Sequence, residues 1–154
     1  EEIKKILVSK KLKYNIVGIE FNVSCPNHKV SNINKQIIKE AKEEFENVII
    51  KIPHLSPLKI IDQFCKTDAN IIHVSNTKKL KNGGLSGKSL IEVNLININY
   101  IKKNYNKKVI AGGGIYSIKD AIRYKKAGAD YFSLSTSLIN PFKTFILIKK
   151  LQYL

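Results

Sequence analysis

Cysteine and histidine are scarce in this sequence, and their scarcity excludes several classes of protein. The 154 residues include two cysteines, Cys25 and Cys65, which stand far apart and form no Cys-x-x-Cys pattern. Neither a disulfide framework nor a structural zinc site is expected from such a pair. The three histidines show no metal-ligand spacing, so we expect no bound metal. Free cysteines also favour a reducing, cytoplasmic setting.

Arginine is nearly absent although the chain is strongly basic. Lysine and arginine number 27 against 12 acidic residues, a formal net charge of +15, yet Arg123 is the sole arginine. The bidentate guanidinium contacts that read guanine or clamp phosphate are therefore almost excluded, and the lysines are spread along the whole sequence. We expect no nucleic-acid partner. Long apolar runs are missing too, since none approaches the ~18 residues that a membrane-spanning helix needs.

Short β-branched runs alternate with longer helical patterns along the whole sequence. This alternation is typical of repeated βα units around a parallel sheet. We expect strands at 16–23, 48–52, 71–75, 108–111 and 131–134, and helices at about 34–45, 57–65, 90–104, 118–127 and 141–151. Residues 1–12 are expected to be the last helix of a preceding unit. A closed (β/α)8 barrel takes about 250 residues, so the sequence predicts an open α/β part of such a TIM-type barrel, with about five βα units.

Glycine gathers in two loops that would follow predicted strands. These loops hold six of the eight glycines, at 83, 84, 87, 112, 113 and 114. The second loop leads into Ser117 and Asp120, whose spacing is that of a capping box at a helix start. Unpaired amides and the helix dipole make such a turn a ready anion site. We expect a phosphate at Gly113 and Gly114, shared with the hydroxyl groups at 135 and 136; a glycine turn without a ligand is the alternative.

The first predicted strand ends in a group of polar side chains. Asn22 and Ser24 are two residues apart and would both point into the barrel, whereas Pro26 ends the strand and leaves Cys25 at its mouth. A deprotonated thiol there can act as a base or a nucleophile. The alternative is a buried, small hydrophobic residue, which is how we interpret Cys65.

One lysine interrupts an otherwise apolar strand. Lys51 lies among valine and isoleucine at 48–52, where a charge is costly unless a partner or a polar ligand meets it. It is therefore a candidate site residue, with a lysine that reaches solvent from the barrel end as the alternative. The third predicted strand ends in polar residues as well, Ser75, Asn76 and Thr77.

Taken in order, these motifs resemble dihydroorotate dehydrogenase. The stretches that carry the resemblance are Asn-Val-Ser-Cys-Pro-Asn at 22–27, Lys51, Ser-Asn-Thr at 75–77, Gly-Gly-Leu-Ser-Gly at 83–87, Ala-Gly-Gly-Gly-Ile at 111–115 and Ser-Thr at 135–136. Several flavin barrels share the Gly-Gly-Ile loop, but the order of the motifs together with the first stretch is specific. The resemblance implies that residues 1–154 are the C-terminal part of a single FMN-binding barrel, whose N-terminal half is missing.

The same resemblance implies a reaction and a set of roles. The reaction is FMN-dependent oxidation of dihydroorotate to orotate in pyrimidine biosynthesis, with Cys25 removing the C5 proton while a hydride passes from C6 to FMN. The implied substrate ligands are Asn22, Asn27, Asn76 and Thr77. The implied FMN ligands are Ser24, Lys51, Gly87, Gly113, Gly114, Ser135 and Thr136.

The electron acceptor and the subclass stay open at this point. A cysteine base resembles the soluble class 1 enzymes, whereas the stretch at 75–77 resembles the membrane-associated class 2, so fumarate, NAD and a quinone are all candidate acceptors. A homo-oligomer is expected. The alternatives are a related flavin barrel, such as a dihydropyrimidine dehydrogenase domain, and a non-catalytic half-barrel remnant.

Overall fold

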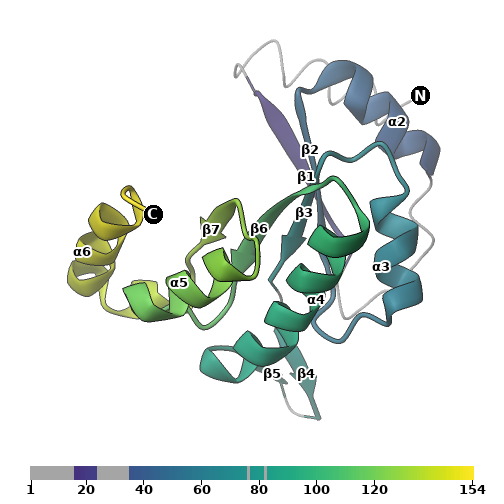
Figure 1. Ribbon diagram of the computed structural model, residues 1–154. Helices are drawn as coiled ribbons and strands as arrows, with labels where there is room; N and C mark the ends of the chain where they lie inside the picture. Colours follow the sequence, from purple (N-terminus) through teal and green to yellow (C-terminus); the bar gives the residue numbers. More distant parts are fainter. Residues whose placement is uncertain (1–15, 24–34, 76, 82) are drawn as a thin grey trace.

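A five-stranded parallel sheet forms the centre of the protein. The computed structural model describes residues 16–23, 35–75, 77–81 and 83–154. The strands, in their order across the sheet, are β1 (Gly18–Asn22), β2 (Asn47–Ile52), β3 (Ile71–Val74), β6 (Lys108–Gly112) and β7 (Tyr131–Ser133). The order of these strands across the sheet is the same as their order along the chain, from purple β1 to green β7 in Figure 1. The sheet is thus built in one direction, as in a barrel.

Each strand of the sheet is followed by a helix. The helices are α2 (Lys35–Glu44), α3 (Leu58–Cys65), α4 (Ile91–Asn104), α5 (Ile118–Lys126) and α6 (Pro141–Leu151). Parallel crossovers are right-handed almost without exception, so a sheet built in one direction carries its helices on one face. The strands and helices expected between residues 16 and 151 are confirmed, with ends shifted by one or two residues. The helix expected at 1–12 lies outside the described residues.

The second strand shows how the sheet separates a core from an open face. Alternate residues of β2 are buried, and the residues between them are half-buried. Because successive side chains point to opposite faces of a strand, the two sets face different surroundings. The buried set, Val48, Ile50 and Ile52, belongs to the core under the helices. Ile49 and Lys51 therefore face the open side, which would be the inside of a barrel.

Polar side chains hold the beginnings of two strands. Oδ1 of Asn70, just before β3, accepts a hydrogen bond from the amide of Val48 at 2.8 Å. Oδ2 of Asp130, just before β7, accepts one from the amide of Val109 at 2.7 Å. Both bonds tie the start of a strand to the strand beside it, and so help to fix the register that aligns the carboxyl ends.

The segment between β3 and α4 contains short secondary-structure elements that the sequence did not predict. It contains an antiparallel hairpin of β4 (Lys78–Leu80) and β5 (Gly83–Leu85), in which Lys78 lies opposite Leu85. A 3₁₀ turn, η1 (Lys88–Leu90), then leads into α4. The glycine-rich loop at 83–87 is therefore half strand and half turn, and it projects beyond the edge of the sheet (Figure 1).

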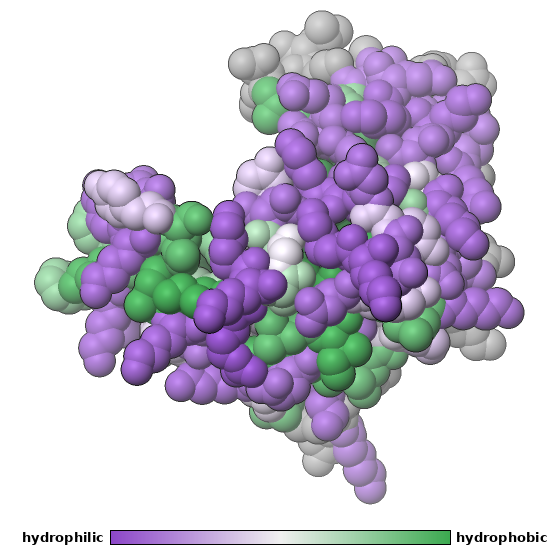
Figure 2. Space-filling model, viewed as in Figure 1, coloured by the Kyte–Doolittle hydropathy of each residue, from purple (hydrophilic) through white to green (hydrophobic). Residues whose placement is uncertain are grey.

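Apolar side chains are exposed along α6 and along the 3₁₀ turn before it, η2 (Thr136–Ile139). Phe142 is 75% exposed and Ile139 84% exposed. Figure 2 shows apolar surface at the left of the view, over α6. Because α6 carries apolar residues all round, packing against α5 covers only part of them. Among the described residues, no helix combines the length and the apolar character needed to cross a membrane.

Candidate active site

The described site residues gather at one edge of the sheet. All five strands run parallel, so their carboxyl ends meet at the same edge, where barrels place their active sites. Asn22 ends β1, and its register partner on β2 is Lys51. Thr77 follows β3 and lies exposed at the base of the hairpin. The structure thus places Asn22 and Lys51, which are 29 positions apart in the sequence, at adjacent positions of this edge.

Four predicted site residues lie outside the described residues, namely Ser24, Cys25, Asn27 and Asn76. Their roles stay predictions. The other cysteine, Cys65, is buried on α3, and burial raises the pKa of its thiol to about 12. A thiol with such a pKa is protonated at neutral pH and serves neither as base nor as nucleophile. The interpretation of Cys65 as a packing residue is confirmed.

Two glycines form a tight turn at the end of β6. Gly113 and Gly114 have φ angles of +81° and +76°, which glycine adopts far more readily than other residues. A Cβ atom on Gly114 would lie 2.7 Å from the backbone oxygen of Gly87, so the two glycine loops are in direct contact. Within the described part of the chain, the amides of Gly113 and Gly114 donate to no backbone carbonyl. These amides are therefore available to a ligand.

The helix that follows the turn begins with the expected capping box. Oγ of Ser117 accepts a hydrogen bond from the amide of Asp120 at 3.3 Å, and Oδ2 of Asp120 accepts one from the amide of Ser117 at 3.0 Å. The same carboxylate oxygen also accepts from the amide of Tyr116 at 3.1 Å. These bonds occupy amides at the start of the helix, and these amides are therefore not available to an anion. The candidate anion site thus has fewer amide donors than the sequence suggests and consists of the glycine turn.

The other predicted phosphate ligands follow the neighbouring strand. Gly112 of β6 is the register partner of Ser133 in β7, so the chain leaves both strands at adjacent positions. Ser135 is exposed and Thr136 is half-buried at the start of η2. Their placement beside the glycine turn agrees with a shared ligand, and their binding of phosphate stays a prediction.

The open face of the sheet holds an acid–imidazole pair that the sequence analysis missed. Nδ1 of His73 lies 2.7 Å from Oε2 of Glu20, and His73 is also the register partner of Lys51. Burial lowers the pKa of His73; the bond to Glu20 opposes this change, and the charge of Lys51 adds to it. A neutral His73 donates through Nδ1 to the carboxylate. Its Nε2 is buried and has no partner among the described residues.

Two more missed residues lie behind the glycine turn. The side chains of Asn94 on α4 and Tyr124 on α5 are almost completely buried, with 1% and 0% exposure. Burial raises the pKa of the Tyr124 hydroxyl to about 12, so it remains a donor at neutral pH. Their positions in helical segments gave no sequence signal, because a single polar residue in a helix does not reveal what it will face.

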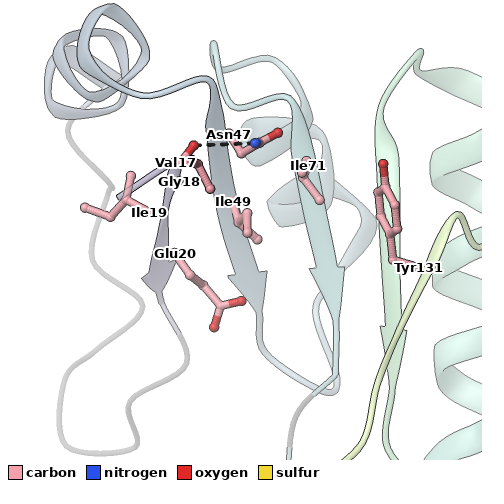
Figure 3. Close-up of a pocket in the computed structure, with 8 residues that line it drawn as sticks. All are labelled: Val17, Gly18, Ile19, Glu20, Asn47, Ile49, Ile71 and Tyr131. Atoms are coloured by element: carbon pink, nitrogen blue, oxygen red, sulfur yellow. Dashed lines mark hydrogen bonds between the residues drawn. The ribbon is translucent and has the colours of Figure 1, made fainter. Parts of the chain in front are cut away.

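A hollow of about 490 Å³ lies at the opposite end of the sheet. Its walls come mostly from the first residues of the strands, including Gly18, Asn47 and Ile71 (Figure 3). Figure 3 also shows Glu20 at the edge of this space and Tyr131 of β7 across it. Barrels carry out chemistry at the carboxyl ends of their strands. We therefore assign the hollow to the interior of the barrel and not to the site.

Comparison with known proteins gives a consistent result. A family model described as dihydroorotate dehydrogenase matches residues 4–152. The chain is 32% identical over 161 residues to the catalytic subunit of dihydroorotate dehydrogenase B (NAD(+)) of Thermoplasma volcanium, covering 90% of this chain and 53% of that protein. The subunit of the same name from Malacoplasma penetrans is 26% identical over 164 residues, covering 90% and 54%. The chain thus spans about half the length of these relatives.

Two solved structures have a fold similar to that of this chain. The chain is similar to a crystal structure of DHODH from Eimeria tenella in complex with ferulenol, with a TM-score of 0.76 and 22% identity over 95% of this chain and 52% of that one. The ligand-free form from the same organism gives a TM-score of 0.71, with 21% identity over 91% and 52%. The expected part of a (β/α)8 barrel is confirmed. Since the family model spans nearly the whole sequence, the chain belongs to the dihydroorotate dehydrogenase family.

Proposed function

We propose that this chain forms the FMN-binding part of an enzyme that oxidises dihydroorotate to orotate. The observation that carries the proposal is the glycine turn at the end of β6. Its amides at Gly113 and Gly114 donate to no backbone carbonyl of the described residues, and they lie at the same sheet edge as Lys51. Dihydroorotate dehydrogenases are FMN-dependent flavoenzymes. Bound FMN would supply the acceptor for the hydride that leaves C6 of the substrate.

The residues present at this edge fit a flavin phosphate. A Cβ on Gly113 would meet Cδ1 of Leu90 at 3.0 Å, and one on Gly114 would meet backbone atoms of Gly87. Side chains at these two positions are therefore disfavoured, so that only the backbone of the turn, half-buried at Gly113 and buried at Gly114, would meet a ligand. Backbone amides without internal partners are suitable donors for an anion. Gly87 is in contact with the turn, and Ser135 and Thr136 follow the neighbouring strand; these three residues would complete the phosphate site.

Lys51 would bring positive charge to the flavin ring. It stands on the open face of the sheet, beside Asn22 on one neighbouring strand and His73 on the other. A cation near N1 and O2 of a flavin stabilises the reduced form. Asn22 would hydrogen-bond the substrate from the adjacent strand end, together with Asn27, Asn76 and Thr77.

The proposed base is Cys25, in the segment that follows β1. Its thiolate would take the proton from C5 of dihydroorotate and become a thiol, while Ser24 beside it would contact the cofactor. The support for these roles is the stretch at 22–27 and the membership of the family. A cysteine base together with relatives named as the NAD(+) form favours class 1.

The partners of the protein follow from the same comparison. Relatives named as catalytic subunits of an NAD(+) enzyme support NAD as the final electron acceptor and a second subunit that transfers electrons to it. Within the described residues, β1 and β7 each pair on one side only. We propose that the remaining part of the barrel closes the sheet at these two strands. A homo-oligomer, a cytoplasmic location and the single-domain extent of residues 1–154 stay predictions.

Release of the bound flavin tests the proposed cofactor. Denaturing the purified full-length protein and separating the supernatant by chromatography should give FMN rather than FAD or riboflavin. Mixing the holoprotein with dihydroorotate under anaerobic conditions should then bleach the flavin absorbance. Dihydrouracil, which lacks the carboxylate, serves as the control substrate and separates this function from that of a dihydropyrimidine dehydrogenase. A colourless protein that cannot be reconstituted with FMN would contradict the proposal.

A second experiment tests the base. A base acts only when it is unprotonated, so flavin reduction should accelerate with pH until the thiol has titrated. Cys25→Ala should slow flavin reduction by about 10² to 10⁴ at unchanged FMN content, and Cys25→Ser should retain a slow reaction. Cys65→Ala is the matched control and should keep the rate of the wild type. Wild-type reduction rates in Cys25→Ala would show that Cys25 is not the base.

A further inference from the structure

The carbonyl groups of the glycine turn are held from behind by two buried side chains. Nδ2 of Asn94 donates to the carbonyl oxygen of Gly112 at 2.9 Å. The hydroxyl of Tyr124 donates to the carbonyl oxygen of Gly113 at 2.8 Å. Asn94 and Tyr124 also contact one another, at 3.3 Å between Nδ2 and the hydroxyl oxygen. Groups buried this completely are costly without partners, so these bonds hold the turn in one arrangement.

Because the peptide bond is planar, the hydrogen bonds to these carbonyl groups also determine where the neighbouring N–H groups point. In a trans peptide, the C=O of one residue and the N–H of the next point to opposite sides. When the carbonyls of Gly112 and Gly113 point inward to Asn94 and Tyr124, the amides of Gly113 and Gly114 must point the other way. Neither of these two amides donates to a backbone carbonyl of the described residues. Both amides therefore point away from Asn94 and Tyr124.

A third buried residue supports the orientation of Asn94. His54, in the loop after β2, is 5% exposed and has Asn94 as a hydrogen-bond partner. The interaction with Asn94 raises the pKa of His54, whereas burial lowers it. His54 thus adds a third buried polar group beside Asn94, whose Nδ2 donates to Gly112.

We propose that Asn94 and Tyr124 are positioning residues that aim the amides of Gly113 and Gly114 at the phosphate of FMN, and that they thereby set the preference for FMN over riboflavin. The inference rests on the proposed function, since it concerns the same site. Neither side chain reaches the ligand, because both act from the buried side of the turn. Their effect is confined to the part of the cofactor that the two amides bind.

The test compares two ligands that differ only in the phosphate. Tyr124→Phe keeps the ring and removes the hydroxyl, and Asn94→Ala removes the donor to Gly112. Tyr100→Phe is the matched control, because its hydroxyl binds Asp62, which retains the hydroxyl of Tyr105 at 2.7 Å. Dissociation constants for FMN and riboflavin are measured by fluorescence on the flavin-stripped full-length protein. Thermal unfolding of each variant shows whether it is folded.

The expected result is a change in the ratio of the two affinities. Loss of one bond that orients a charge-binding amide should weaken FMN about tenfold, a factor that corresponds to ~1.4 kcal/mol, while riboflavin binding changes less than about twofold. A purely structural role would weaken both ligands together, and this outcome, or an unchanged ratio in both variants, would overturn the inference. A wild type that binds no flavin, or that binds riboflavin as tightly as FMN, would instead refute the proposed phosphate site itself.

Discussion

Replacing Gly114 by alanine tests the contact between the two glycine loops. The new Cβ would lie 2.7 Å from the oxygen of Gly87 and 2.8 Å from Cγ1 of Ile91, closer than real Cβ contacts. The backbone at this position also has a φ of +76°, which costs a non-glycine residue roughly 1–2 kcal/mol. The loop around Gly87 would have to move, because one obstacle is backbone rather than the end of a flexible side chain.

The magnitude follows from the two contributions. Overpacking of this kind costs about 1–3 kcal/mol, so the two effects together should lower the free energy of unfolding by about 2–5 kcal/mol. The control is Gly128→Ala, also at a positive φ, of +102°, where the Cβ would lie 2.8 Å from Cγ of Lys102, so that a side chain and not a backbone segment would have to shift. That variant lacks the backbone obstacle and should lose only about 1–2 kcal/mol. It lies in the turn before β7, away from the site.

The assay has two readouts on the full-length protein. Urea denaturation of the flavin-free protein gives the free energy of unfolding, and fluorescence titration gives the affinity for FMN. Gly114→Ala should show the larger loss of stability and a large loss of FMN affinity, whereas Gly128→Ala should bind FMN like the wild type. Equal stability of the two variants, with wild-type FMN affinity in Gly114→Ala, would refute the argument that these loops are packed against one another.

Three further predictions concern the sheet. Lys51→Met should lower the reduction potential of the bound flavin, because it removes the positive charge that favours the reduced form; a spectroelectrochemical titration with exposed Lys119→Met as control measures this. Because burial lowers the pKa of His73, the unfolded state binds the proton more readily than the folded state. The free energy of unfolding should therefore decrease as the pH drops below about 6.5, by at most about 1.4 kcal/mol per pH unit. Urea denaturation at several pH values should show a smaller slope for His73→Gln. Ile72→Ala, at a site with 0% exposure, should cost about 2–5 kcal/mol of stability, whereas Ile96→Ala, at a site that is 63% exposed, should change it by less than about 0.5 kcal/mol in the same assay.

Most of the secondary structure was predictable because it depends on local patterns. The five parallel strands are short β-branched runs that are buried or half-buried on one or both faces, and the helices between them carry apolar residues at helical spacing. The capping box at Ser117 and Asp120 was readable for the same reason, since its partners are three residues apart. The hairpin of β4 and β5 was missed because its strands are only three residues long and one contains two glycines. The Asn-Gly step at 82–83 was the available signal.

Some features of the candidate site depend on neighbouring residues and could be predicted, whereas others depend on residues far apart in the sequence. A glycine run after a strand indicates an anion site in any sequence, because it depends on backbone geometry that neighbouring residues determine. The orientation of that turn depends on Asn94 and Tyr124, which are 30 positions apart and meet only because α4 and α5 both pack behind β6. The pair of Glu20 and His73 spans 53 positions and requires β1, β2 and β3 in register. Sequence periodicity by itself therefore determined which segments become strands, helices and glycine turns, whereas the partner of each buried polar group was decided by tertiary packing, since a hydrogen bond forms only where two distant segments are brought within about 3 Å.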